Sequence, residues 1–314
     1  MEGIIGVTYR CNAKCVMCDT WRYPTRPEQE IKPEVLHKLP AMQFTNITGG
    51  EPFVRNDLAE IVHIIKKKTK RIVISTNGFF TDRIIQLAKE NKDIGIRISI
   101  EGLPKSNDEL RGIKDGFDKG LRTLLELKYL GIKDIGFGIT VSDRNAKDLL
   151  ELYRLADAMH LEFATAVVHN SYYFHKFNNE IKEKDIVAAE FQTLVNELLK
   201  SKRIKNWYRA YFNHGIINYV YGRKRLLPCE VGSDVFYLDP FGDIRPCNAM
   251  DEPIGNLNQQ NAFAEIWNSP GAKTMRQKVA TCDKQCWMIG SVSPAIKKYP
   301  WQPTLWVLRN KFKL

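Results

Sequence analysis

Short apolar runs rich in β-branched residues alternate with amphipathic stretches over the first half of the chain, and this alternation limits the possible folds. The predicted strands cover residues 3–8, 44–48, 71–76, 95–101, 135–141 and 162–168. Helical periodicity follows several of them, at 57–68, 117–131 and 146–160. Such an alternation predicts parallel strands joined by right-handed crossovers. Both a barrel and a doubly wound sheet fit, and both place functional groups at the carboxyl ends of the strands.

The sequence pattern changes after residue 180. Two further helices are predicted at 184–202 and 206–222, and short strands with a Pro-Phe-Gly-Asp turn at 235–246 suit a hairpin. A module of about 60 residues is small enough for a metal site to supplement its core. We therefore expect an α/β core at 1–180, a helical linker at 181–227, a cysteine-rich α+β module at 228–290 and a basic aromatic tail at 291–314.

The seven cysteines form two groups. Cys11, Cys15 and Cys18 follow the first predicted strand, and the C-terminal module holds Cys229, Cys247, Cys282 and Cys286. No apolar run approaches the ~20 residues that cross a bilayer, and no signal-peptide pattern opens the chain. We therefore expect a cytoplasmic protein with reduced thiols. Clustered cysteines there are more often metal ligands or catalytic groups than disulfides.

The spacing of the first three cysteines suits a reactive metal site. Three thiolates on one loop can hold three corners of an iron–sulfur cubane and leave one iron open to another ligand. A structural zinc site is the alternative, but it needs a fourth ligand nearby. The nearest histidine, His37, lies on a predicted helix, and Asp19 would be an unusual zinc ligand.

The segment CNAKCVMC (11–18) resembles the CxxxCxxC signature of the radical SAM superfamily. Met17 stands where that family usually has an aromatic residue, and its apolar bulk should still pack. The resemblance covers residues 3 to about 170 and implies a partial (βα)6 TIM-like barrel. It also implies that Cys11, Cys15 and Cys18 bind a 4Fe–4S cluster whose open iron is chelated by S-adenosylmethionine (AdoMet).

Further matches follow the other predicted strands. Gly49, Gly50 and Glu51 resemble the family's GGE motif, which meets the methionyl amino group, and glycine permits close backbone approach. The resemblance implies further AdoMet contacts from Ser75, Asn77, Ser99, Glu101, Arg111, Thr140 and Asn145. Among these, Ser99 and Arg111 match a carboxylate-binding pair. Any one of them alone is equally typical of a turn or cap.

The C-terminal cysteines resemble the SPASM/twitch extension of radical SAM enzymes. Four thiols without histidine suit either a fully ligated iron–sulfur cluster or zinc. A full SPASM module has more cysteines, so the resemblance implies the shorter twitch form with one auxiliary cluster. The expected cofactors are therefore two 4Fe–4S clusters and AdoMet, with structural zinc as the alternative for the second site.

The cysteine count bears on the reaction type. Three plus four uses all seven cysteines, so no thiol remains to return a hydrogen atom to a substrate radical. We therefore expect dehydrogenation at a carbon that bears a hydroxyl or amine, with a sugar, aminocyclitol or sugar conjugate as substrate. A redox-neutral epimerase and a peptide-modifying maturase are the alternatives. The maturase is less favoured because no peptide-binding domain precedes the predicted barrel.

The loop at 169–177 is dense in aromatic and histidine side chains. It follows the sixth predicted strand, where substrate would enter. We expect His169 and Tyr172 to serve in proton removal or hydroxyl binding, with Tyr173 and His175 as further candidates. Packing beneath the C-terminal module is an equally good interpretation for each.

The net charge of +11 and the basic aromatic tail bear on partners. We expect an external electron donor such as flavodoxin or ferredoxin. The tail at 300–314 suits peripheral contact with an anionic membrane, although docking onto the barrel is the commoner role of such a segment. No nucleic acid is expected as a partner. A zinc-stabilised RNA-binding protein, which would use the positive charge, is the alternative from another functional class.

Overall fold

The computed structural model describes residues 1–313, and six parallel strands form the wall on which the molecule is built. The order β6-β5-β4-β3-β2-β1 follows the chain without reversal. A doubly wound sheet reverses its strand order, so the sequential order is that of a partial barrel, as predicted. The strands are β1 (Glu2–Gly6), β2 (Phe44–Thr48), β3 (Ile72–Thr76), β4 (Gly95–Ser99), β5 (Ile135–Val141) and β6 (Glu162–Val167).

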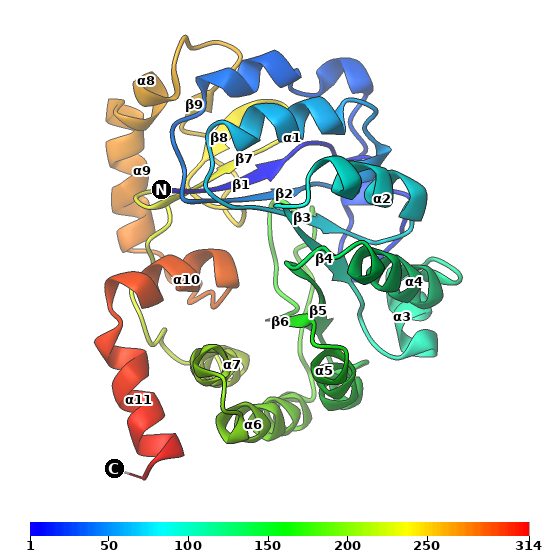
Figure 1. Cartoon of the computed structure of the whole chain (residues 1–314). Helices are drawn as coiled ribbons and strands as arrows, with labels where there is room; N and C mark the ends of the chain where they lie inside the picture. The colour runs from blue at the N-terminus through cyan, green and yellow to red at the C-terminus, as the bar shows by residue number, and fades with distance from the viewer. Residues whose placement is uncertain (314) are drawn as a thin grey trace.

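Helices cover the outer side of this wall (Figure 1). Ile47, Ile74 and Ile96 on neighbouring strands are fully buried, because β-branched side chains fill the space between wall and helices. The covering helices are α1 (Leu58–Lys66), α2 (Thr81–Glu90), α3 (Pro104–Arg111), α4 (Gly116–Tyr129) and α5 (Leu149–Ala158). The predicted helices at 57–68, 117–131 and 146–160 correspond to α1, α4 and α5.

The second half of the chain closes the open side of the partial barrel (Figure 1). The two helices predicted after residue 180 are present as α6 and α7, which pack against each other. The remaining helices descend along one side of the view. These elements are α6 (Lys184–Lys200), α7 (Ile204–Val220), α8 (Phe263–Trp267), α9 (Pro270–Ala280), α10 (Ile289–Lys298) and α11 (Trp301–Lys311).

The predicted C-terminal hairpin joins the barrel sheet. Its strands are β7 (Val235–Leu238) and β8 (Asp243–Arg245), and β9 (Gly255–Asn256) follows. β7 pairs in parallel with β1, with Ile4 opposite Tyr237. One nine-stranded sheet therefore runs from β6 to β9. The domain boundary predicted near residue 228 stays a prediction, and the hairpin shares its sheet with the core.

Trp287 packs the end of the cysteine-rich C-terminal module against α7. The indole is 1% exposed and donates from Nε1 to Phe212 O at 2.8 Å. A Cβ added at Gly215 would lie 2.1 Å from the Trp287 ring, so only glycine fits at this point of α7. Arg225 also donates from Nη1 to Cys286 O. The cysteine-rich segment is thereby held against the barrel.

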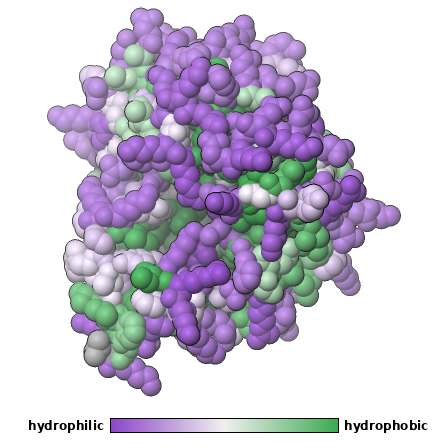
Figure 2. Space-filling model, viewed as in Figure 1, coloured by the Kyte–Doolittle hydropathy of each residue, from purple (hydrophilic) through white to green (hydrophobic). Residues whose placement is uncertain are grey.

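The tail docks onto the barrel through α11. This helix packs on α6 and α7, with Tyr208 and Thr304 hydroxyls 3.0 Å apart. Its outer face leaves Trp301 and Leu305 exposed, and Figure 2 shows apolar surface in the region where Figure 1 places α11. Within residues 1–313 no helix is long and apolar enough to cross a membrane. Membrane contact by the tail stays a prediction.

Candidate active site

The loop that carries the first three cysteines is tied to the end of α3. Lys14 N donates to Arg111 O at 3.0 Å, and Val16 N donates to Leu110 O at 2.9 Å. Met17 is buried with Leu110 in a small apolar cluster beside Cys15, so its apolar bulk packs as predicted. These backbone bonds fix the loop at the carboxyl end of β1.

Burial dominates the chemistry of the three thiols. It raises the pKa of Cys11 to about 12, and it raises the pKa of Cys15 and Cys18 as well. The charge of Cys15 adds to the rise of the pKa at both Cys11 and Cys18. Clustered buried thiols are costly to ionise unless a metal compensates, so this environment fits an iron–sulfur cluster. Among residues 1–313 no three Cys, His, Asp or Glu side chains stand in metal-holding geometry, so the fit rests on spacing and burial.

The GGE motif packs directly on the cysteine loop. Gly50 N donates to Thr8 O at 2.7 Å, and Glu51 N donates to Arg10 O at 2.9 Å. A Cβ added at Gly50 would lie 2.3 Å from Arg10 O, and one at Gly49 would lie 2.5 Å from Thr8 O. The glycines are therefore required by the contact between the two loops, a reason that the sequence alone did not indicate.

Glu51 joins the ends of β2 and β3. Its fully buried carboxylate accepts hydrogen bonds from Thr76 Oγ1 at 2.7 Å, Asn77 N at 2.7 Å and Phe53 N at 3.1 Å. Burial raises its pKa, and these donors oppose the rise. Asn77 Nδ2 in turn donates to Asn12 Oδ1 in the cysteine loop at 2.7 Å. The motif and the cysteine loop thus form one hydrogen-bonded unit.

A second polar group gathers around Glu101. Arg111 Nη1 lies 2.9 Å from Glu101 Oε1, and Thr140 N donates to Glu101 Oε2 at 2.5 Å. Asn145 Nδ2 donates to Glu101 O at 2.6 Å and to Thr140 O at 3.0 Å. Asn145 therefore braces this turn, and a role in a turn is one of those that the sequence left open. The predicted AdoMet contacts of all four residues stay predictions.

Arg111 has a free donor in this group. The residue is 8% exposed, and its Nε has no hydrogen-bond partner among the described residues. A buried guanidinium N–H without a partner is unfavourable, and an anionic ligand would satisfy it. This fits the carboxylate of AdoMet. Ser75 instead donates to Asn46 Oδ1 at 2.9 Å, and Ser99 ends β4 partly buried.

The loop at 169–177 lies between the barrel and the C-terminal module. The Tyr173 hydroxyl accepts from Gly49 N at 3.1 Å and also donates to Gly49 O, so Tyr173 positions the GGE motif. The Arg245 guanidinium of β8 lies over the Tyr172 ring, with its Cζ 4.4 Å from the ring centroid. His175 packs on Tyr9 with ring centroids 4.9 Å apart. Packing accounts for the contacts of these three rings, and the proton-transfer role predicted for Tyr172 stays a prediction.

His169 is held differently. It is 8% exposed, and Nδ1 lies 3.1 Å from Val167 O. The carbonyl can only accept, so Nδ1 carries the proton and Nε2 is an acceptor in the neutral ring. Burial lowers the pKa of His169, which favours that neutral form. Its Nε2 finds no partner within residues 1–313.

The C-terminal cysteines form the second group. Cys229 and Cys247 pack against Val231, Val235 and Val279. Burial raises the pKa of Cys247 to about 12. A backbone hydrogen bond opposes this rise, and the charges of Cys229 and Cys286 add to it. Burial and the charge of Cys282 likewise raise the pKa of Cys286. Four neighbouring thiols suit a fully ligated cluster.

Sequence comparison matches both regions to known domains. The radical SAM superfamily model matches residues 5–156, and the SPASM iron–sulfur cluster-binding domain model matches residues 229–288. The mycofactocin maturase MftC of Mycolicibacterium smegmatis is 31% identical over 273 residues, which cover 83% of this chain and 68% of that protein. The chain belongs to the radical SAM superfamily.

Other relatives of this radical SAM enzyme carry names of different activities. Fe-coproporphyrin III synthase of Methanosarcina barkeri is 34% identical over 163 residues, 48% of this chain and 39% of that protein. The sporulation killing factor maturation protein SkfB of Bacillus subtilis is 25% identical and covers 94% of this chain and 70% of that protein. The chain thus spans well under half of the synthase and about two thirds of each maturase.

Solved structures share the fold. Native anSMEcpe with bound AdoMet gives a TM-score of 0.65 at 14% identity and covers 100% of both chains. Streptococcus suis SuiB bound to precursor peptide SuiA gives 0.65 at 15% identity, covering 90% of this chain and 70% of SuiB. The cofactors of the radical SAM and SPASM domains are AdoMet and 4Fe–4S clusters, as predicted.

Several residues that support the site were missed by sequence reasoning. Glu30 accepts both guanidinium branches of Arg10 at 2.9 and 2.8 Å, and it accepts from Thr25 at 2.7 Å, which braces the entry to the cysteine loop. Asn12 meets Asn77. A buried glutamate among polar neighbours carries no periodic sequence signal, because its partners lie in the irregular segment between β1 and β2.

Proposed function

We propose that this radical SAM enzyme binds AdoMet at the cluster held by Cys11, Cys15 and Cys18, and oxidises a residue of a peptide. The contact between the cysteine loop, the GGE motif and Arg111 supports the proposed AdoMet binding. Backbone bonds from Lys14 to Arg111 and from Glu51 to Arg10 bring these groups to one edge of the sheet. When bound, the cluster and AdoMet supply a carbon-centred radical that removes a hydrogen atom from the substrate.

The chain's own residues hold AdoMet in this proposal. Arg111 contributes its unpaired Nε to the methionyl carboxylate while Nη1 keeps the ion pair with Glu101. Tyr173 fixes the backbone of Gly49, so the GGE carbonyls keep their direction. Cys229, Cys247, Cys282 and Cys286 would hold the auxiliary cluster, whose fully ligated irons suit electron transfer.

A peptide substrate is preferred over the sugar or aminocyclitol predicted from the sequence. Maturases are among the relatives that align over most of this chain, and SuiB shares its fold. The tetrapyrrole enzymes among the relatives are the second candidate, which their sequence identity supports. The small-molecule substrate stays a prediction.

The first test is reductive cleavage of AdoMet. Anaerobically reconstituted protein with dithionite should form 5′-deoxyadenosine. The Cys11→Ala, Cys15→Ala, Cys18→Ala triple variant should lose this activity and about half of the iron, because each 4Fe–4S cluster holds four of about eight irons. Zinc in place of the remaining iron would overturn the auxiliary cluster. An active triple variant would overturn the AdoMet site.

A further inference from the structure

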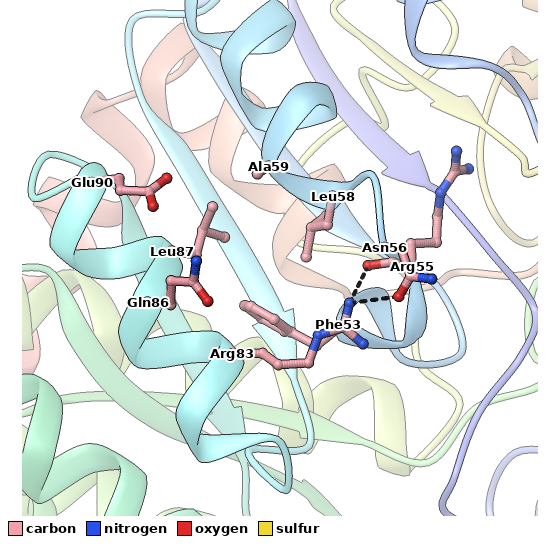
Figure 3. Close-up of a pocket in the computed structure, with 9 residues that line it drawn as sticks. All are labelled: Phe53, Arg55, Asn56, Leu58, Ala59, Arg83, Gln86, Leu87 and Glu90. Atoms are coloured by element: carbon pink, nitrogen blue, oxygen red, sulfur yellow. Dashed lines mark hydrogen bonds between the residues drawn. The ribbon is translucent and has the colours of Figure 1, made fainter.

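A cavity of about 310 Å³ opens beside the carboxyl end of β6, next to the start of α6 and the end of α7. A smaller cavity of about 130 Å³ lies outside the barrel against α1 and α2 (Figure 3). There Arg83 Nη2 donates to Arg55 O at 2.9 Å and to Asn56 Oδ1 at 3.0 Å, so this guanidinium already has partners within the protein. The larger cavity is lined in part by His169, whose buried Nε2 has no hydrogen-bond partner among residues 1–313, and this distinguishes it.

The wall of the larger cavity is apolar with polar groups at its rim. Val168, Ile181 and Val220 contribute apolar surface, and the rings of His169 and Tyr219 complete it. The exposed side chains of Glu180 and Lys184 add one charge of each sign at the rim. An apolar wall with a few polar groups is the usual composition of a ligand pocket.

The unpartnered Nε2 of His169 sets the chemistry of the occupant. Nδ1 is committed to Val167 O, so Nε2 is left as an acceptor in the neutral ring. A buried acceptor without a partner is unfavourable, and a ligand donor would satisfy it. The occupant should therefore carry an O–H or N–H group.

The cavity lies between the two cysteine groups. On one side Val168 packs with Met17 in the cluster next to Cys15, and Asn179 Nδ2 donates to Met17 O at 3.0 Å. On the other side, α7, which contributes Tyr219 and Val220, is bound to the residue that follows Cys286, through the hydrogen bond from Trp287 Nε1 to Phe212 O at 2.8 Å. A group seated here can reach toward both sites.

We propose that this cavity receives one side chain of a peptide substrate, whose O–H or N–H group donates to His169 Nε2. The inference rests on the proposed function. The volume of the cavity is at the lower end of the ~300–1,000 Å³ range of ligand pockets, which suits a single aromatic side chain. A tetrapyrrole macrocycle is several times larger than one side chain. The mixed charges at the rim suit the donors and acceptors of the adjoining peptide backbone.

Titration calorimetry on the reconstituted full chain tests the pocket with two defined probes. N-acetyltyrosinamide carries a phenolic donor, and N-acetylphenylalaninamide lacks it. The tyrosine amide should bind about three- to tenfold more tightly, which one hydrogen bond supplies. His169→Phe should abolish this difference, whereas His63→Phe on the exposed face of α1 should leave it unchanged. Ile181→Trp should fill the cavity and weaken both probes by about tenfold or more.

Lys184→Trp at the exposed start of α6 is the second variant if Ile181→Trp fails to fold. Equal affinity of the two amides for wild type, or undiminished binding in the folded filling variant, would overturn the proposal. Binding of coproporphyrin III that the same variant abolishes would also overturn it. If 5′-deoxyadenosine forms but neither amide binds, the proposal for the cavity is wrong and the proposed AdoMet cleavage stands. If amides bind as expected and no 5′-deoxyadenosine forms, the proposed function is wrong.

Discussion

At the residue scale, Arg111 binds two partners in the proposed site. Nη1 pairs with Glu101 at 2.9 Å and Nε is left for the AdoMet carboxylate. A lysine has one nitrogen and cannot serve both partners in fixed directions. Arg111→Lys should weaken AdoMet binding by about tenfold or more, as loss of a charge-assisted hydrogen bond implies. Equilibrium dialysis of anaerobic protein, together with an iron assay, measures this.

Arg97→Lys is the matched control for that prediction. Arg97 is a partly buried arginine in the middle of β4, and it pairs with Asp134 at 2.5 Å. Its exchange should leave AdoMet affinity unchanged, and both variants should keep their iron. Unchanged affinity in Arg111→Lys would mean that the guanidinium serves only Glu101.

Motif residues could be predicted from sequence because their spacing is local. Cys11, Cys15 and Cys18 lie within one loop, and the GGE residues follow one strand. The contacts of Tyr173 could not be predicted, because its hydroxyl reaches a glycine 124 positions away in the chain. Aromatic residues in a loop have no pattern that separates such a contact from ordinary packing.

At the element scale, the parallel strands were predictable and one sheet pairing was not. β-branched runs reveal strands, and the strand order follows from short crossovers. The hairpin at β7 and β8 was also indicated by its turn. Its pairing with β1 joins Glu2 to Val235, and no local pattern encodes a partner so distant in sequence. The predicted module therefore extends the barrel sheet.

The contact between α7 and the C-terminal module gives a prediction at the same scale. Gly215→Ala would place a Cβ 2.1 Å from the Trp287 ring, which must then move. Overpacking of this kind costs about 1–3 kcal/mol of unfolding free energy. Because Trp287 follows Cys286, the auxiliary site should also lose iron. Denaturant unfolding and iron assay measure the two effects.

Gly271→Ala is the control for this prediction. Gly271 lies in α9, where the nearest atom to an added Cβ is the Ser269 hydroxyl at 3.6 Å, an ordinary contact. Alanine is the better helix former, so this exchange should be neutral or slightly stabilising. Equal losses of stability and iron in Gly215→Ala and Gly271→Ala would show that the Trp287 contact contributes nothing specific.

At the scale of the whole molecule, the proposed oxidation rests on the arrangement of the seven cysteines in two groups. One group lies next to the apolar cluster of Met17 and Val168, and the other includes Cys286, whose neighbour Trp287 is bound to α7. If all seven are cluster ligands, as the proposed function has it, no thiol remains to return a hydrogen atom to the substrate. A substrate that has lost one hydrogen atom beside an O–H or N–H group then reaches a stable product by losing an electron and a proton.

The resulting prediction is oxidation with one AdoMet consumed per product. A synthetic peptide library, incubated with AdoMet and reductant in deuterated water, should yield products that are lighter by two hydrogens and carry no deuterium at carbon. Mass spectrometry with 5′-deoxyadenosine quantification measures both quantities. Heat-treated enzyme is the control. A product of unchanged oxidation state with solvent deuterium at carbon would contradict oxidation, because it requires a hydrogen donor other than cysteine. Tyr172, partly buried at the junction of the two halves, would then be the first residue to exchange for phenylalanine.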